Sequence, residues 1–158
     1  MRRMLVRQDT SPGRAAEAEG AARAGTDVIL LFCRIGMTCL FYVSIRGKLA
    51  NIDGFVAGLT ARGVPGGMAM GYLAVTVEIL GTLGVLLGLA TRQAALLLAV
   101  FVVVATMISH RYWELPPDQA PNQMTHFYKN VSIFAGYLLL YVTGPGRYSL
   151  DRWLGRTI

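Results

Sequence analysis

Glu78 lies near the middle of residues 71–90, "GYLAVTVEILGTLGVLLGLA", a stretch otherwise made of apolar and small residues. An ionised side chain inside lipid costs about 2.5–3.5 kcal/mol on insertion scales. The carboxyl group can offset this cost by pairing with a cation, which gives a structural ion pair. It can also stay protonated, which gives a group able to exchange a proton with a bound ligand. Both alternatives stay open, and the functional one is slightly favoured because intramembrane carboxylates usually serve function.

Polar residues elsewhere gather on one helical face of each apolar run, because residues three, four and seven apart share a face. In the run at 27–45 and just beyond it, this face holds Arg34, Thr38, Phe41, Ile45 and Lys48. In the run at 93–110 it holds Val103, Thr106, Met107 and His110, and in that at 126–144 it holds His126, Lys129, Asn130, Ile133 and Tyr137. We expect these faces to meet inside a bundle.

The face of Glu78 itself is made of small residues, which allow neighbouring helices to approach closely. It holds Gly71, Ala74, Val75, Gly81, Thr82 and Val85. Arg34 lies roughly 9 Å from Glu78 along the bundle axis at about 1.5 Å of rise per residue. It would therefore have to reach outward to form a pair. Lys48 or Lys129 reaching inward is an equal alternative.

Composition places these faces in a membrane. The chain has 158 residues, of which 54% are hydrophobic and 15% charged, with a mean hydropathy of +0.47. Soluble domains carry about 25% charged residues. Four apolar runs, at 27–45, 71–90, 93–110 and 126–144, are each about the length that crosses a ~30 Å hydrocarbon core. The expected fold is all-α, an integral membrane four-helix bundle.

The segments outside these runs have distinct compositions. Residues 1–26 are rich in Ala, Arg, Gly and Glu and are predicted to be a disordered tail. The connection 47–68 contains apolar residues at helical spacing, which predicts a short interfacial or re-entrant helix after the first span. The connection 111–125 begins with aromatic residues typical of a membrane boundary, and its prolines argue against regular structure. The predicted domain covers residues 27–152, with a cytoplasmic end at 153–158.

Basic residues predict the orientation, because cytoplasmic segments are enriched in Lys and Arg. The N-terminal tail holds five Lys and Arg residues, the turn between the second and third runs holds one, and the C-terminal end holds three. The two connections on the other side of the membrane together hold five. Both termini are therefore predicted to be cytoplasmic. The net charge of +6 does not indicate a nucleic-acid partner, because the basic residues form no stripe interleaved with aromatics.

Metal and thiol chemistry are poorly supported. His110 and His126 lie at helix ends near water, with no further ligand at metal spacing, so interfacial hydrogen bonds are the favoured interpretation. Cys33 and Cys39 are six residues apart on different faces of one helix and are predicted to be small buried side chains. No Cys-x-x-Cys motif is present.

A succession of short motifs resembles the DoxX family over residues 27–152. It consists of Arg34, "GKL" at 47–49, Glu78, "GLATR" at 88–92, "SHRYW" at 109–113, "HFYKN" at 126–130 and "GPGRYSLD" at 144–151. The resemblance implies a small four-helix protein of the bacterial cell membrane. Related DoxD-type proteins form the membrane subunit of a thiosulfate:quinone oxidoreductase, and some DoxX proteins are linked to oxidative-stress complexes. The family's recurrent polar positions correspond to Arg34, Lys48, Glu78, His110, Lys129 and Asn130.

Two functions follow as hypotheses. In the first, the chain is the quinone-interacting subunit of a redox complex, with no covalent cofactor and with electrons supplied by a partner oxidoreductase. Glu78 is then the catalytic proton carrier, and Arg34, Lys48, His110, Lys129 and Asn130 bind the ligand. In the second, the chain is a non-catalytic scaffold, alone or as a homo-oligomer, whose ion pair fixes helix register. A transporter is a weaker third, because no inverted repeat is evident.

Overall fold

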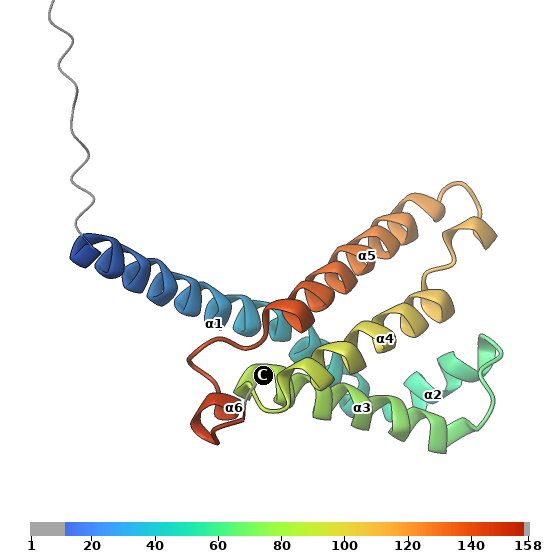
Figure 1. Cartoon of the computed structure of the whole chain (residues 1–158). Helices are drawn as coiled ribbons and strands as arrows, with labels where there is room; N and C mark the ends of the chain where they lie inside the picture. Colours follow the sequence, from blue (N-terminus) through green and yellow to red (C-terminus); the bar gives the residue numbers. More distant parts are fainter. Residues whose placement is uncertain (1–11, 157–158) are drawn as a thin grey trace, which may run out of the picture.

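Helices make up most of the described chain, residues 12–156 of a computed structural model (Figure 1). The elements are α1 (Pro12–Ala50), α2 (Ile52–Ala61), α3 (Gly67–Leu87), α4 (Thr91–Ser109), the 3-10 turn η1 (Tyr112–Glu114), α5 (Ala120–Thr143) and α6 (Leu150–Trp153). No strand occurs in this range. The predicted all-α class is therefore confirmed.

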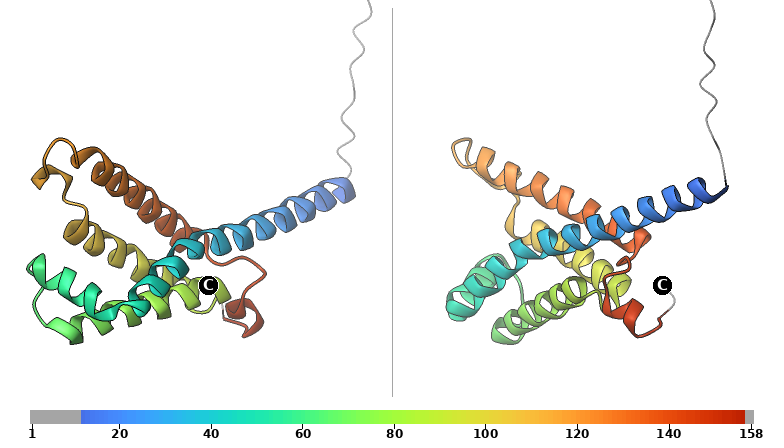
Figure 2. Two further views of the ribbon diagram at one scale, coloured as in Figure 1. Left: turned by 180° about the vertical axis from the view of Figure 1, so that it is seen from behind. Right: turned by 90° about the vertical axis from the view of Figure 1, so that its left-hand side faces the viewer.

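The helices pack as a bundle in which successive long elements run in opposite directions. α4 lies against both α3 and α5, while α1 and α2 both pack on α3 (Figures 1 and 2). α1, α3 and the segment that begins with α4 are long and apolar enough to cross a membrane, by length and composition. The fourth predicted run forms most of α5, which is 24 residues long but carries more polar side chains in its first half.

The buried core lies where small residues let α3 and α4 approach each other. A Cβ atom built on Gly81 would stand 2.6 Å from Cγ of Leu98, a side chain that is fully buried. Tyr137 of α5 and Phe41 of α1 close this core with an edge-to-face ring contact at 5.8 Å. Many large apolar side chains point outward instead, for example Val142, which is 69% exposed. Such an apolar exterior suits a lipid solvent.

The prediction of a disordered tail at residues 1–26 is wrong for residues 12–26, because these form the first turns of α1. Residues 1–11 lie outside the described part of the chain. The segment contains many Ala, Glu and Arg residues, which have high helix propensity, and it continues an apolar helix that is already formed. At 39 residues α1 is about 58 Å long. Its first half projects away from the other helices (Figure 2), and residues 13–26 are exposed.

The two connections give one confirmation and one correction. The short helix expected after the first span is α2, and the Asn51 side chain caps it by accepting a hydrogen bond from the Gly54 N–H at 3.0 Å. The segment 111–125 was predicted to be irregular because of its prolines, and this is wrong for its last residues, since α5 already begins at Ala120. Pro121 lies in its first turn, where the missing N–H of proline costs no helical hydrogen bond.

The two cysteines were predicted to be buried, and this is wrong. Both Cys33 and Cys39 are exposed on α1. They lie off the face that carries Arg34, Thr38 and Phe41, and that face is the one that packs inward. A thiol is only weakly polar, so it can lie on an apolar exterior without a hydrogen-bond partner on another helix. The Cys39 Sγ donates to the Ile35 carbonyl of its own helix.

Asp151 joins the C-terminal segment to the start of α4. Its carboxylate accepts hydrogen bonds at 2.8 Å from the N–H groups of Ala90 and Thr91, and one at 2.9 Å from the Thr91 hydroxyl. The residue at the N-cap position, Ala90, lacks a capping side chain and has φ 45°. Burial alone would raise the pKa of the Asp151 carboxyl. The Thr91 and Ala90 hydrogen bonds and the nearby Arg156 outweigh it and lower this pKa below its ordinary value.

Gly81→Ala should lower the free energy of unfolding by about 1–3 kcal/mol, because the added Cβ meets a fully buried Leu98. The matched control is Gly36→Ala in α1, where nothing lies within 4 Å of the added atom. Ala is the better helix former, so the control should be neutral or slightly stabilising. Thermal denaturation in one detergent measures both. Equal effects of the two substitutions would contradict the close α3–α4 packing.

Asp151→Asn should destabilise the protein by about 1–2 kcal/mol at neutral pH, because the amide NH2 replaces one of the two oxygens that accept hydrogen bonds from Ala90 and Thr91. The carboxyl has a lowered pKa in the folded state, so its stabilising effect is complete above the ordinary value of 3.8. It is lost as pH falls through the folded-state pKa. The difference in melting temperature between the native protein and the variant should therefore be constant from about pH 7 to 5 and shrink below about pH 4. A difference that grows on acidification would contradict this role.

Candidate functional site

An ion pair between Lys48 and Glu78 lies at the centre of the polar residues. The Lys48 Nζ stands 2.6 Å from the Glu78 Oε2, and the Glu78 side chain is only 1% exposed. Lys48 comes from the last turn of α1, and Glu78 from the middle of α3. Of the three cations that the sequence left open as partners, Lys48 is the one that pairs.

Two aromatic rings flank the same ammonium group. The Lys48 Nζ is 5.2 Å from the ring centroids of both Phe55 in α2 and Phe101 in α4. Such contacts stabilise a cation by about 0.5–2 kcal/mol, more when water is excluded. One ammonium therefore links four helices: α1, which carries it, α2 and α4 through the rings, and α3 through the carboxylate.

The predicted face of Glu78 is confirmed by the burial of α3. Its buried residues are Gly71, Val75, Glu78, Gly81, Thr82 and Val85. This row places the carboxylate inside the bundle. The face predicted for α4 is only partly right, because Val103 and Met107 are 43% and 50% exposed. The buried row of α4 runs instead through Ala95, Leu98, Ala99, Val102 and Thr106.

A cavity of about 250 Å³ opens beside the ion pair. Five of the six predicted site residues line it, namely Lys48, Glu78, His110, Lys129 and Asn130. Its remaining walls are mostly apolar and consist of Leu40, Phe41, Phe101, Val102, Ala105 and Ile133, with Ser44 and Ser109. The cavity thus combines an apolar slot with polar groups from α1, α3, α4 and α5, which is typical of small-molecule sites.

The polar groups of α4 and α5 hold each other in place. The Asn130 Nδ2 donates to the Thr106 hydroxyl at 2.9 Å, and this hydroxyl donates to the Val102 carbonyl at 2.6 Å. The Lys129 Nζ lies 3.1 Å from the His126 Nδ1. Since an ammonium has three N–H donors and an amide nitrogen has two, Lys129 and Asn130 keep donors for a bound ligand.

His110, which lines the cavity, stacks face to face with His126. Their ring centroids are 5.3 Å apart with an interplanar angle of 22°. The His110 Nδ1 is 2.8 Å from the Gln123 Oε1, an acceptor, so Nδ1 carries the ring proton in this contact. Within residues 12–156, no group of three or more His, Cys, Asp or Glu side chains is placed to hold a metal ion.

Arg34, the sixth residue predicted to belong to the site, lies apart from the other five. It is 1% exposed, does not line the cavity, and donates only to backbone carbonyls. Its acceptors are the carbonyls of Val85, Leu86, Pro145 and Tyr148, at 2.7–2.9 Å. The last carbonyls of a helix have no partner within the helix and carry a partial negative charge. Arg34 therefore ties the end of α3 to the C-terminal segment.

Several cavity residues were not predicted as site residues. Phe41 was assigned to the polar face of α1 but given no role, while Ser44 and Phe101 carried no signal. Thr106 was placed on the α4 face, but its hydrogen bond to Asn130 depends on how α4 and α5 pack. Gln123, which contacts His110, lies in the segment expected to be irregular.

Comparison with known proteins gives consistent matches. The sequence profile of the family described as DoxX matches residues 29–111. "Inner membrane protein YphA" of Escherichia coli (strain K12) is 37% identical over 133 residues, which are 84% of this chain and 93% of that protein. "Inner membrane protein YqjF" of the same strain is 37% identical over 130 residues, or 82% and 95% of the two chains.

A more distant match is "ER-derived vesicles protein ERV29" of Saccharomyces cerevisiae, 29% identical over 80 residues. It covers 51% of this chain and 26% of the yeast protein. No solved structure matches the chain significantly. The two E. coli proteins are thus similar along nearly their whole length, whereas the yeast protein shares one part.

Lys48→Met should lower the free energy of unfolding by about 3–5 kcal/mol, because it leaves a buried carboxylate without a partner. Glu78→Gln should cost less, since the Lys48 ammonium keeps its aromatic neighbours and is 18% exposed. The double variant should recover at least half of the Lys48→Met loss. Lys129→Met on the exposed rim is the control and should change stability by less than about 0.5 kcal/mol. Denaturation in detergent measures all four, and additive effects at Lys48 and Glu78 would contradict the pair.

Proposed function

Because this chain belongs to the DoxX family of membrane proteins, we propose that it binds a quinone in the cavity beside Lys48 and Glu78 and serves as the membrane subunit of a redox complex. The observation that supports this most is the buried Lys48–Glu78 pair in the wall of an otherwise apolar cavity. An ion pair that only fixed the helices would need no cavity next to it.

The groups around the cavity suit a quinone head. Such a ring needs hydrogen-bond donors for two carbonyl oxygens and apolar surface for its faces. Lys129 and Asn130 offer the donors, while Phe41 and Phe101 offer ring faces. A volume of about 250 Å³ suits a single substituted ring better than a drug-sized ligand. Leu40 in the cavity wall is 43% exposed, which gives an apolar tail a way out toward lipid.

The Lys48–Glu78 ion pair takes part in proton transfer to the quinone. A quinone supplies two-electron redox chemistry, and its reduction consumes two protons. Glu78, held by the Lys48 ammonium at 2.6 Å, starts as a carboxylate, so it first takes a proton from water and then passes this proton to the reduced quinone; the second proton also comes from water. The electrons come, in this proposal, from a partner oxidoreductase.

The orientation proposed for the chain has both termini in the cytoplasm, following the excess of Lys and Arg at that end. The structure supports a shared end, because the Arg147 N–H donates to the Asp27 carboxylate at 2.8 Å. The start of the apolar part of α1 and the C-terminal segment therefore lie together. In this orientation the quinone cavity belongs to the outer half of the bundle.

A non-catalytic scaffold is the second candidate, and one observation favours it. The Lys48 ammonium already has a carboxylate and two aromatic rings as neighbours, so the pair is satisfied without a ligand. In that case neutralising both charges in a Lys48→Met/Glu78→Gln variant should leave any complex with partner proteins intact. A quinone site should lose ligand binding in the same variant, even if the complex persists.

Isothermal titration of the purified protein with a short-chain ubiquinone or menaquinone analogue tests the site. We expect saturable binding that Lys129→Met and Asn130→Leu each weaken about tenfold, the effect of losing one hydrogen bond from the cavity wall to a quinone carbonyl oxygen. Asn122→Leu, at an exposed position in the first turns of α5, is the matched control and should bind normally. Absence of saturable binding, or unchanged affinity in both Lys129→Met and Asn130→Leu, would rule out the quinone site.

A further inference from the structure

A second cavity lies at the other end of the bundle, where α1, α4 and the C-terminal segment meet. It has a volume of about 390 Å³ and is therefore larger than the cavity beside Glu78. Four arginines line it, Arg92, Arg147, Arg152 and Arg156, together with a single acidic residue, Asp27. Neither the ion pair nor the proposed quinone site uses any of them.

The charges in this cavity are not balanced by the protein. Asp27 already accepts a hydrogen bond from the Arg147 N–H, and Arg156 is 3.7 Å from Asp151. Among the described residues, the other three arginines form no ion pair with a carboxylate. The Arg92 Nε is buried without a hydrogen-bond partner in this part of the chain. A bound anion would supply what these guanidinium groups lack, and phosphate matches their paired donors best.

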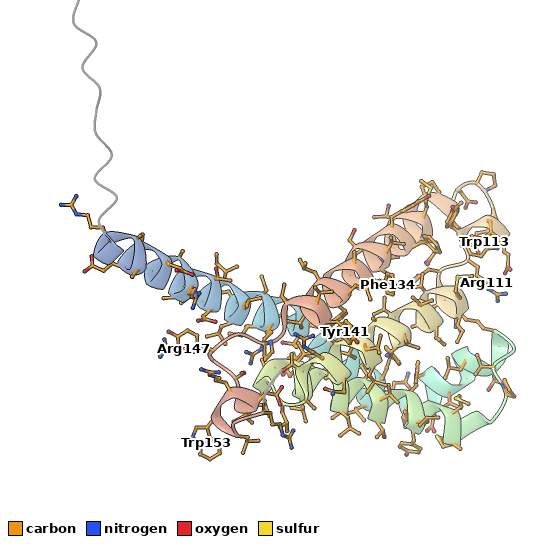
Figure 3. All side chains as sticks on the ribbon, in the orientation of Figure 1. Arg111, Trp113, Phe134, Tyr141, Arg147 and Trp153 are labelled. Atoms are coloured by element: carbon orange, nitrogen blue, oxygen red, sulfur yellow. The ribbon has the colours of Figure 1, made fainter. Side chains whose placement is uncertain are left out.

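Exposed aromatic residues place this cavity at the level of lipid head groups. Tyr141, Tyr148 and Trp153 are 41%, 51% and 81% exposed. Figure 3 shows Arg147 and Trp153 at this end of the molecule, with Arg111 and Trp113 at the far end. Amphipathic aromatic rings collect at both membrane–water interfaces. An arginine-lined cavity at one of these levels meets phospholipid phosphates rather than acyl chains.

The wall of the cavity is held in place before any ligand binds. Arg34 donates to the carbonyls of Pro145 and Tyr148 at 2.9 and 2.7 Å, which fixes the segment that carries Arg147. Gly146 has φ 73°, and an added Cβ would lie 3.1 Å from the Leu30 Cδ1 on α1. A preformed site loses little conformational entropy on binding. Arg34 thus acts here as a positioning residue.

We propose that this cavity binds the phosphate of an anionic phospholipid. Apolar surface for its acyl chains lies next to the arginines, because Ile29 of α1 and Val142 of α5 are 63% and 69% exposed. Free phosphate can make the same contacts with the arginines, but it has no acyl chains that could cover this apolar surface. Basic cavities between membrane helices are known lipid head-group sites. The inference does not depend on the quinone site, which lies at the other end.

Native mass spectrometry and thermal denaturation of the full-length protein test this proposal. Detergent-solubilised protein is mixed with phosphatidylglycerol, with phosphatidylcholine, or with inorganic phosphate alone. We expect retained adducts and a raised melting temperature with phosphatidylglycerol only. The Arg147→Gln/Arg152→Gln variant removes two exposed cavity arginines and should weaken this binding about tenfold or more. Arg46→Gln/Arg62→Gln removes the same charge outside this cavity and should bind like the native protein.

Three outcomes would overturn the proposal. Equal adducts with both lipids would show that charge does not select the ligand. Equal losses in the two double variants would show that net charge, not this cavity, attracts the lipid. Stabilisation of the native protein by inorganic phosphate, without an effect of phosphatidylglycerol, would assign the arginines to a soluble anion. The two variants should melt at the same temperature in phosphatidylcholine, which confirms that both are folded.

Discussion

The carboxylate of Glu78 must be neutralised inside an apolar bundle, and the rest of the structure is arranged around this requirement. Lys48 can reach it only because α1 continues as one helix to Ala50 and crosses α3 at the right height. Phe55 and Phe101 then bring α2 and α4 to the same ammonium. The small residues along α3 let these helices come close enough. Removing Lys48 alone would leave the buried Glu78 carboxylate without a partner in a medium that cannot solvate it.

The polar residues at the two ends of the bundle have different roles. At one end, Arg34 and Asp151 satisfy backbone groups where α3 ends and α4 begins, and both join the C-terminal segment to this end of the bundle. At the other, Lys48, Glu78, Lys129 and Asn130 surround a cavity. Arg34 has no donors directed at that cavity, whereas Lys129 keeps donors in its wall. The arrangement separates residues that hold the fold from residues that can meet a ligand.

The buried helix faces and most of the cavity's polar residues could be predicted from the sequence, because helical periodicity alone places residues on a face. The row from Gly71 to Val85 is buried as expected, and five predicted polar residues share one cavity. The choice of Lys48 over Arg34 could not be predicted, since it depends on how α1 crosses α3. The acceptors of Arg34 are backbone carbonyls, which leave no trace in the pattern of side chains. Low hydrophobicity also concealed the helix at residues 12–26, whose alanines favour helix without any packing partner.

Glu78 is an ionised carboxylate paired with Lys48 inside the membrane, and the packing around it depends on this pair. Infrared difference spectroscopy of the protein in lipid bilayers at neutral pH tests it directly, by subtracting the spectrum of Glu78→Gln from that of the native protein. For an ionised pair, we expect the difference spectrum to contain the carboxylate stretching bands of one glutamate, and we expect these bands to change in Lys48→Met. A carbonyl band of a protonated carboxylic acid in their place would contradict it.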